Sequence, residues 1–329
     1  MNKYKSILIT GGTGTFGKNF VLNLLNQKKF RKIIIFSRDE LKQSEMKKLK
    51  YFSDKRLRFF IGDIRDKQRL KHAFSDVDIV VHAAALKQVD TAEYNPIEFI
   101  KTNVIGAQNI IEASIDTKVK HVIALSTDKA VSPVNLYGAT KLCSDKLFVA
   151  SSNFIGSNKI KFSIVRYGNV DGSRGSIIPL FLSQQEQGLP FSITDKKMTR
   201  FSISVEKAVE MVNWAIINSK GGDIIIPKLK SYNIIDLANA INTKWKKKII
   251  GLRPGEKLFE ELISVSDSED CYDIGKYFIL IPKNIVEQKY KNILKKKVKN
   301  RFSYNSIENK LLSRLELKKI INKIKKNII

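Results

Sequence analysis

The chain has 329 residues, of which 43% are hydrophobic, enough for one large or two fused domains with a full core. No uncharged apolar run approaches the roughly 18 residues of a membrane helix, and no apolar leader with a cleavage site precedes the first strand, so we expect a cytoplasmic protein without membrane insertion. The formal net charge is +27, from 59 Lys and Arg against 32 Asp and Glu, which points to anionic partners.

Apolar strands and helices alternate through the N-terminal half. Strands are predicted at residues 6–10, 32–36, 57–61, 78–82, 121–125 and 161–167, with helices beginning near Phe16, Asp39, Lys67, Pro96 and just before Tyr137. This alternation predicts an α/β fold with a doubly wound parallel sheet of the Rossmann type. Right-handed crossovers bring the carboxyl ends of all these strands to one rim, where ligands bind.

A glycine-rich loop follows the first strand and opens a helix. Its candidate cofactor contacts are Gly11, Thr13, Gly14, Thr15, Phe16 and Gly17. Glycines allow a tight turn and a close approach of the backbone to a pyrophosphate, which binds at a helix N-terminus. The loop therefore predicts a dinucleotide site.

The end of the second strand indicates which dinucleotide binds. A carboxylate there would bind the ribose hydroxyl of NAD, whereas Ser37 and Arg38 suit the 2′-phosphate of NADP. Asp39 follows, and it could instead cap the next helix. Further cofactor contacts are expected after the third and fourth strands, from Asp63, Ile64, Ala83, Ala84 and Lys87.

The stretch after the strand at 121–125 carries the candidate chemistry. Ser126, Thr127, Asp128 and Lys129 lie at the strand's carboxyl end. Beyond them Tyr137 and Lys141 lie one helical turn apart. A nearby cation would lower the pKa of a tyrosine from about 10 and make it a candidate base. The alternative is a core tyrosine beside a solvated lysine.

The second half of the chain is less regular. It contains a helix after residue 176, a short strand at 191–195, an amphipathic helix at 205–218, and a strand at 222–227 that could return to the sheet. We expect a dinucleotide-binding domain at 1–170 with 201–227 returning to it, a smaller α+β substrate lobe at 171–200 and 228–283, and a basic C-terminal tail at 284–329.

The basic charge is spread along the chain and increases toward its end. Residues 283–329 hold 15 Lys and Arg against 3 Asp and Glu. The tail could be an ordered surface helix, an oligomer contact or a frayed end. Diffuse basicity favours a small anionic substrate over nucleic acid. The two cysteines, Cys143 and Cys271, have no metal-site spacing, so we expect reduced thiols and no metal.

The order of the motifs resembles one enzyme family. ITGGTGTFGK, SRDELKQ, GDIRD, HAAALK, ALSTDKA, NLYGATKL, RYGNV, MTRF and RPGEKL, within residues 5–263, are similar to the inverting UDP-N-acetylglucosamine 4,6-dehydratases of the extended short-chain dehydrogenase/reductase superfamily. Retaining relatives carry Thr-Asp-Glu where this chain has Thr127-Asp128-Lys129. The resemblance implies a homo-oligomeric lyase of pseudaminic acid biosynthesis. Such an enzyme converts UDP-N-acetylglucosamine, through NADP, into UDP-2-acetamido-2,6-dideoxy-β-L-arabino-hexos-4-ulose.

The resemblance also implies roles for the residues. Tyr137 would deprotonate the sugar's 4-hydroxyl, Lys129 would remove the C5 proton, and Asp128 would protonate the leaving 6-hydroxyl. Lys129 needs a lowered pKa for this, which we expect from desolvation beside the cationic nicotinamide and Lys141. Ser126 and Thr127 would hydrogen-bond the 4-oxygen. Asn103, Tyr167 and Asn169 are expected near the cofactor, and Lys87, Asn169, Arg174, Thr199, Arg200, Arg253 and Glu256 near the substrate.

Several residues depart from the family pattern. They are Gln88, Asp90, Asp171 in place of an apolar residue, Ser202 in place of Trp, and Phe259. These departures concern the fine structure of the substrate site. They keep two alternatives open: a related NADP-dependent UDP-sugar dehydratase or epimerase for fucosamine-type sugars, and a non-catalytic dinucleotide-binding regulator.

Overall fold

The protein is described by a computed structural model that covers residues 4–153, 159–173, 175–281, 290, 294 and 296–328. Seven strands form the parallel part of its main sheet: β1 (Ser6–Thr10), β2 (Lys32–Ser37), β3 (Leu57–Ile61), β4 (Ile79–His82), β5 (His121–Thr127), β6 (Lys161–Tyr167) and β10 (Ile224–Pro227). Three antiparallel strands extend it: β14 (Cys271–Asp273), β15 (Tyr277–Leu280) and β16 (Lys296–Lys297).

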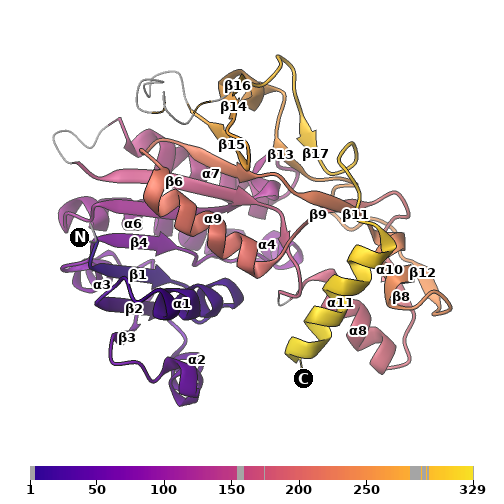
Figure 1. The fold of residues 1–329 in the computed structure, drawn as a ribbon, viewed down its shortest axis with the longest axis horizontal. Coiled ribbons are helices and arrows are strands. Elements are labelled where there is room, and N and C mark those ends of the chain that lie inside the picture. The colour runs from indigo at the N-terminus through magenta and orange to yellow at the C-terminus, as the bar shows by residue number, and fades with distance from the viewer. Residues whose placement is uncertain are drawn as a thin grey trace.

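The strand order is β16-β14-β15-β10-β6-β5-β4-β1-β2-β3 (Figure 1). The order reverses direction between β1 and β4, which is the switch point of a doubly wound sheet. Every strand predicted in the N-terminal half is present, and 222–227 does return to the sheet, with β10 parallel to β6. The predicted α/β fold with a parallel sheet is confirmed.

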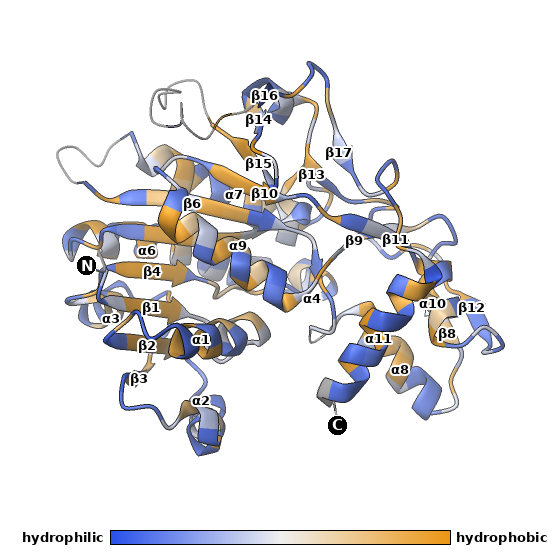
Figure 2. Cartoon of the chain, in the orientation of Figure 1, coloured by the Kyte–Doolittle hydropathy of each residue, from blue (hydrophilic) through white to orange (hydrophobic). Residues whose placement is uncertain are grey.

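Helices cover both faces of the sheet. They are α1 (Thr15–Gln27), α2 (Glu40–Lys48), α3 (Lys67–Phe74), α6 (Gly106–Asp116), α7 (Leu136–Ser151) and α9 (Val205–Asn218). The first and last of these pack together on one face, while α3, α6 and α7 lie side by side on the other (Figure 1). The central strands β1 and β4 are buried along their whole length and mostly apolar (Figure 2), as expected for a sheet buried on both sides.

The helix predicted from Pro96 is more complicated than expected. It consists of α5 (Pro96–Phe99), a π-helical stretch (Ile100–Ile105) and α6, and it is preceded by α4 (Val89–Tyr94), which the sequence analysis does not predict. A π-helical turn shifts the hydrogen-bond register and often lies beside a functional site. Here it buries Asn103 against the loop that follows β4.

A smaller lobe lies beyond the carboxyl rim of the main sheet (Figure 1). It contains β7 (Asn169–Val170), β9 (Thr199–Ile203) and β11 (Lys230–Asn233) in one sheet, β8 (Phe191–Ile193) paired with β12 (Lys247–Ile249), and the helices α8 (Ile177–Glu186) and α10 (Ile234–Ile241). Residues 271–280, assigned to this lobe from the sequence, instead extend the main sheet as β14 and β15. The fully buried apolar strand β15 covers the edge of β10 that would otherwise be unpaired.

The tail is part of the folded molecule. β17 (Tyr304–Asn305) pairs with β13 (Glu261–Ile263), and α11 (Arg314–Ile328) packs on α10. Leu317 and Ile321 of α11 lie in the same apolar cluster as Phe181 and Leu237. The end of the tail is thus an ordered helix and not a frayed end, while an oligomer contact stays a prediction. Among the described helices, none combines the length and apolarity needed to cross a bilayer.

Candidate active site

A cleft of about 720 Å³ runs along the carboxyl rim of the main sheet and beneath the lobe. Nearly all of the predicted site residues line it: Gly11, Thr13, Gly14, Thr15, Phe16, Gly17, Ser37, Arg38, Asp63, Ile64, Ala83, Ala84, Lys87, Ser126, Thr127, Asp128, Lys129, Tyr137, Lys141, Tyr167, Asn169, Arg200, Arg253 and Glu256. The strand ends supply most of them, as the topology requires. Arg174 lies outside the described residues.

Two predicted contact residues do not line the cleft, and their predicted direct roles need correction. The Asn103 side chain accepts from the Leu86 backbone N–H (2.9 Å) and donates to the Leu86 carbonyl (2.9 Å) and to Thr140 Oγ1 (3.1 Å). The Thr199 hydroxyl lies 2.8 Å from Ser306 Oγ. Both side chains are buried and engaged in internal hydrogen bonds, so they support the walls of the cleft from behind.

The glycine loop provides a cradle for an anion. Gly11 has a φ of +66°, and a Cβ there would come 2.9 Å from the backbone of Ala84. Gly14 begins α1 without a side-chain cap, and the first turn of that helix has no acidic residue. The free N–H groups of α1 therefore open onto the cleft, where a diphosphate would satisfy them.

Arg38 lies at the open end of the cleft, where its guanidinium is 56% exposed and 4.0 Å from Asp63 Oδ2. Ser37 Oγ is 3.0 Å from Thr13 Oγ1, which ties the end of β2 to the glycine loop. Asp39 caps α2 by accepting from the Lys42 backbone N–H (2.9 Å), so its alternative role as a helix cap is the correct one. Arg38 thus remains available to a ligand phosphate.

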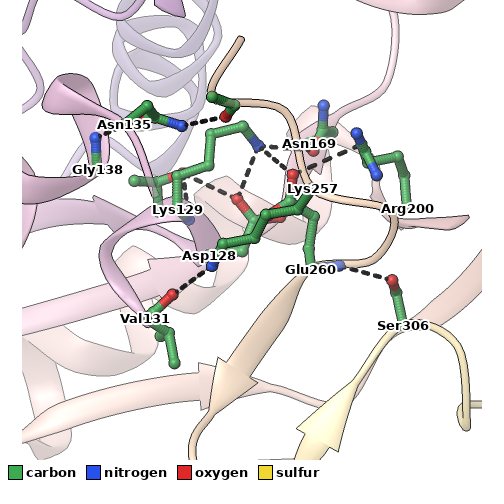
Figure 3. Close-up of polar contacts among 12 residues, drawn as sticks. Asp128, Lys129, Val131, Asn135, Gly138, Asn169, Arg200, Lys257, Glu260 and Ser306 are labelled. Atoms are coloured by element: carbon green, nitrogen blue, oxygen red, sulfur yellow. Dashed lines mark hydrogen bonds and ion pairs between the residues drawn. The ribbon is translucent and has the colours of Figure 1, made fainter. Parts of the chain in front are cut away.

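The other end of the cleft holds a buried cluster of charges (Figure 3). Lys129 Nζ lies 3.0 Å from Asp128 Oδ1, 3.2 Å from Glu260 Oε1 and 3.4 Å from Asn169 Oδ1. Asp128 is 0% and Glu260 2% exposed. Glu260 was missed from the sequence because its signal is weak. It is one acidic residue in an ordinary Glu-Leu-rich stretch, brought to Lys129 only by the fold.

The electrostatics of the cluster correct two expectations. Burial lowers the pKa of Lys129, but the charges of Asp128 and Glu260 outweigh it and leave this pKa above its ordinary value. Burial likewise raises the pKa of Tyr137 to about 12, and the groups that oppose the rise are the Lys129 charge and a hydrogen bond with Thr127. The protein's own groups therefore shift both pKa values in the direction opposite to the expected one, while the expectation for Lys129 refers to the site with the cationic nicotinamide bound.

Two neighbouring polar groups point away from the reacting region. Lys141 Nζ donates to the Leu125 carbonyl (2.9 Å), and burial lowers its pKa. Ser126 Oγ donates to Asp145 Oδ2 (2.7 Å), which also accepts from Arg166 (3.3 Å). The Ser126 proton is thus directed into the protein, and Thr127 is the hydroxyl that faces Asp128, at 3.0 Å.

Four of the residues that depart from the family pattern are explained as contacts. Ser202 Oγ donates to Asp171 Oδ2 (2.6 Å), so these two departures form one hydrogen-bonded pair. Asp90 lies 3.4 Å from the Arg253 guanidinium across the mouth of the cleft. The amide of Gln88 lies beside Gly175 in the cleft wall. Phe259 is 37% exposed, and nothing in the structure explains it.

An uncapped glycine loop and a Tyr-Lys helix that open on one cleft define an extended short-chain dehydrogenase/reductase. The family model described as "Polysaccharide biosynthesis protein" matches residues 7–282, and the chain belongs to this family. It is 51% identical to a UDP-N-acetylglucosamine 4,6-dehydratase (inverting) of Campylobacter jejuni (strain 81-176), over 97% of each protein.

Other comparisons give the range of similar proteins. A UDP-glucose 4-epimerase of Rickettsia akari is 40% identical, over 96% of this chain and 95% of that protein. The X-ray structure of Pen from Bacillus thuringiensis superimposes with a TM-score of 0.91 at 35% identity, over 99% of both chains. DesIV, a dTDP-glucose 4,6-dehydratase from Streptomyces venezuelae, shares the fold with a TM-score of 0.73 at 20% identity.

Proposed function

We propose that this protein is a UDP-N-acetylglucosamine 4,6-dehydratase that inverts C5, a hydro-lyase of polysaccharide biosynthesis. The observation that carries the proposal is the pair of Asp128 and Lys129, side by side at the end of β5 inside the cleft that also holds Tyr137. An acid and a base next to each other are what removal of water across C5 and C6 requires. The 51% identical relative of that name supports the same conclusion.

The cleft fits a nicotinamide dinucleotide. The glycine loop and the start of α1 would hold its diphosphate, Asp63 and Ile64 would lie at its adenosine, and Tyr137, Lys141 and Tyr167 at the opposite end. When bound, such a cofactor supplies a reversible hydride acceptor for C4 of the hexose and a positive charge next to the sugar. NADP is the proposed form, because Ser37 and Arg38 at the end of β2 match a 2′-phosphate.

The choice of cofactor is tested with Arg38→Ala. Loss of a charge-assisted contact is expected to raise the Kd for NADPH about tenfold or more, with little change for NADH. Arg65→Ala is the matched control, because Arg65 also pairs with Asp63 (2.8 Å) but does not line the cleft. Fluorescence titration measures both affinities. Equal weakening of NADPH and NADH by Arg38→Ala would contradict the assignment.

The elimination step uses a single proton shared by two neighbours. The ion pair of Asp128 and Lys129 holds as many protons as a carboxylic acid next to a neutral amine. Burial raises the pKa of Asp128, with the nearby Glu260 charge adding to the rise and Lys129 opposing it, so Asp128 is suited to hold that proton. In that form Lys129 takes the C5 proton while Asp128 protonates the 6-hydroxyl, which leaves as water.

The remaining proton transfers fall to Tyr137 and Lys129. Tyr137 accepts the proton of the 4-hydroxyl as the phenolate and becomes a phenol, and the positive charge of Lys129 and a hydrogen bond with Thr127 favour the phenolate beforehand. Inversion requires that C5 regain a proton on the face opposite to the one it lost. Lys129 and Tyr137 are the two candidate donors for that step.

The nucleotide part of the substrate is proposed to bind under the lobe. Arg200, Arg253 and Lys87 line this side of the cleft and carry positive charges that suit a diphosphate, and Glu256 beside them would accept from ribose hydroxyls. The guanidinium fork suits a diphosphate. Arg200 is the most buried of these groups, at 8% exposed, and it donates to the Thr199 carbonyl (2.8 Å).

The direct test is incubation with UDP-N-acetylglucosamine followed by NMR of the product. The expected product is a 4-keto-6-deoxy sugar with inverted C5, and deuterium placed at C4 is expected to reappear at C6. A 4-epimer with its 6-hydroxyl intact would instead indicate an epimerase, the name carried by the 40% identical relative. An epimerase needs Tyr137 and Lys141 but has no use for the Asp128 and Lys129 pair, which is why the dehydratase is preferred.

A further inference from the structure

Glu260 is a carboxylate inside the molecule that neither the glycine loop nor the Tyr-Lys helix accounts for. It lies just before β13 and is 2% exposed. Its Oε1 lies 3.2 Å from Lys129 Nζ and 3.5 Å from Arg200 Nε. Its Oε2 is buried without a hydrogen-bond partner among the described residues. A buried carboxylate is costly to keep, so its retention at this place calls for a role.

The backbone holds Glu260 in a fixed position. Its N–H donates to Ser306 Oγ (3.0 Å), and its carbonyl accepts from the Ser306 N–H (2.8 Å). Two residues earlier, the Leu258 carbonyl accepts from the Thr199 N–H (2.9 Å). The carboxylate therefore reaches Lys129 from a rigid support that belongs to the lobe and the tail (Figure 3).

The three acceptors around Lys129 match the three protons of an ammonium group. They are Asp128 Oδ1, Asn169 Oδ1 and Glu260 Oε1. A neutral amine has only two N–H bonds, so it keeps two acceptors and points its lone pair where the third was. In the proposed elimination Asp128 is itself protonated and accepts nothing from Lys129. Glu260 and Asn169 then hold the two N–H bonds, and this fixes the orientation of the amine and of its lone pair.

We propose that Glu260 is the positioning residue of Lys129: its carboxylate directs the amine and sets the pH range in which the amine works as a base. This inference rests on the proposed dehydratase function. It also accounts for Arg200, whose guanidinium partly balances the second carboxylate next to Lys129. Glu260 touches neither the reacting carbon nor the leaving hydroxyl in this role.

The charged groups around Lys129 indicate how its pKa changes when the Glu260 charge is removed. They are Asp128, Glu260 and Arg200, with Lys87, Tyr137 and Lys257 further out. Burial raises the pKa of Glu260, but the positive charges of Lys129 and Arg200 outweigh burial and keep this pKa below its ordinary value. Removing this negative charge lowers the pKa of Lys129, because Arg200 then acts without a counter-ion.

The test is the pH dependence of kcat for Glu260→Gln, with melting temperature as the check on folding. The acidic limb is expected to move at least about one pH unit to lower pH, as removal of an opposite charge at this distance predicts. The maximal kcat is expected to fall about tenfold or more, because the amide holds the amine less well. Glu261→Gln, the same change on the next residue, is expected to leave both values unchanged.

Glu260→Asp keeps the negative charge but places it one methylene group farther from Lys129. The acidic limb is therefore expected to move to lower pH by a smaller amount than in Glu260→Gln. It also carries the test if the Gln variant does not fold. If the acidic limb of the kcat profile coincides with that of the wild type in both variants, the inference is overturned. A wild-type protein that removes no water from UDP-N-acetylglucosamine would overturn the proposed function instead, before any variant is assayed.

Discussion

Asp171 is a carboxyl group held against Ser202 where its surroundings favour the uncharged form. Burial raises its pKa to about 7, while the Ser202 hydrogen bond and Lys207 oppose the rise. An unfolded aspartate has a pKa near 3.9, so the folded state is penalised as pH rises from about 4 through 7. At about 1.4 kcal/mol per pKa unit, the free energy of unfolding should fall by about 2–4 kcal/mol over this range.

Asp171→Asn tests this penalty, because the amide stays neutral and still accepts from Ser202. The variant is expected to be more stable than the wild type at pH 8 and to lose that advantage by pH 4. Urea unfolding at several pH values measures the difference. Asp195→Asn makes the same change in the loop after β8 and serves as the control. A stability difference for Asp171→Asn that does not vary with pH would contradict the assigned pKa.

The site could be predicted from the sequence wherever its residues follow a strand end or share a helical turn. Asp128, Lys129 and Tyr137 belong to that group, and all three line the cleft. Glu260 could not be predicted in this way, because only the tertiary fold brings it to Lys129. The same contact raises the pKa of Lys129, because Glu260 adds a second carboxylate next to the amine that its sequence position does not reveal.

At the scale of elements, the short pair of β13 and β17 supports the active site. Ser306, directly after β17, is fully buried, and its Oγ accepts from the Glu260 N–H and lies 2.8 Å from Thr199 Oγ1. Ser306→Ala leaves these groups without a partner and is expected to lower the free energy of unfolding by about 1–3 kcal/mol.

Ser303→Ala is the matched control for Ser306→Ala in urea unfolding. Ser303 donates to Glu261 Oε1 (3.1 Å) at a partly buried position, so its loss is expected to cost less than about 1 kcal/mol. Equal stability of the two variants would indicate that the Ser306 hydrogen bonds do not support β13.

The regular elements follow from periodicity, and the irregular ones do not. Strands such as β1 and β4 have four and three consecutive apolar or β-branched residues, and the structure confirms their predicted positions. The six-residue α4 is too short for a helical period to be recognised. The π-helical turn at Ile100–Ile105 has no sequence pattern that distinguishes it from an ordinary helix, and its buried Asn103 contacts Leu86, which only the tertiary fold brings close.

At the scale of the whole molecule, α11 closes the core of the lobe (Figure 2). Leu317 is 1% exposed in the apolar cluster of α8 and α10, whereas Leu315 on the same helix is 65% exposed. Leu317→Ala is expected to lower the free energy of unfolding by about 2–5 kcal/mol. Leu315→Ala makes the identical chemical change with an expected effect within about 0.5 kcal/mol. Similar unfolding midpoints for both variants would show that α11 is not a structural part of the lobe.

The overall layout was predictable up to the point where the chain stops alternating. The parallel sheet follows from the repeated strand and helix pattern, and its rim follows from the handedness of the crossovers. The return of β14 and β15 to the main sheet was not predictable. Their pairing depends on the uncovered edge of β10, a feature that exists only after the sheet has formed.

The central claim is that Lys129 removes the C5 proton in an elimination that inverts C5. It is tested most directly by NMR of the product formed in D₂O by the wild type and by Lys129→Met. The wild type is expected to give a 4-keto-6-deoxy product with deuterium at the inverted C5. Lys129→Met is expected to bind NADPH with unchanged affinity and to form neither this product nor any deuterium label at C5. Formation of the C5-deuterated product by Lys129→Met at the wild-type rate would contradict the claim.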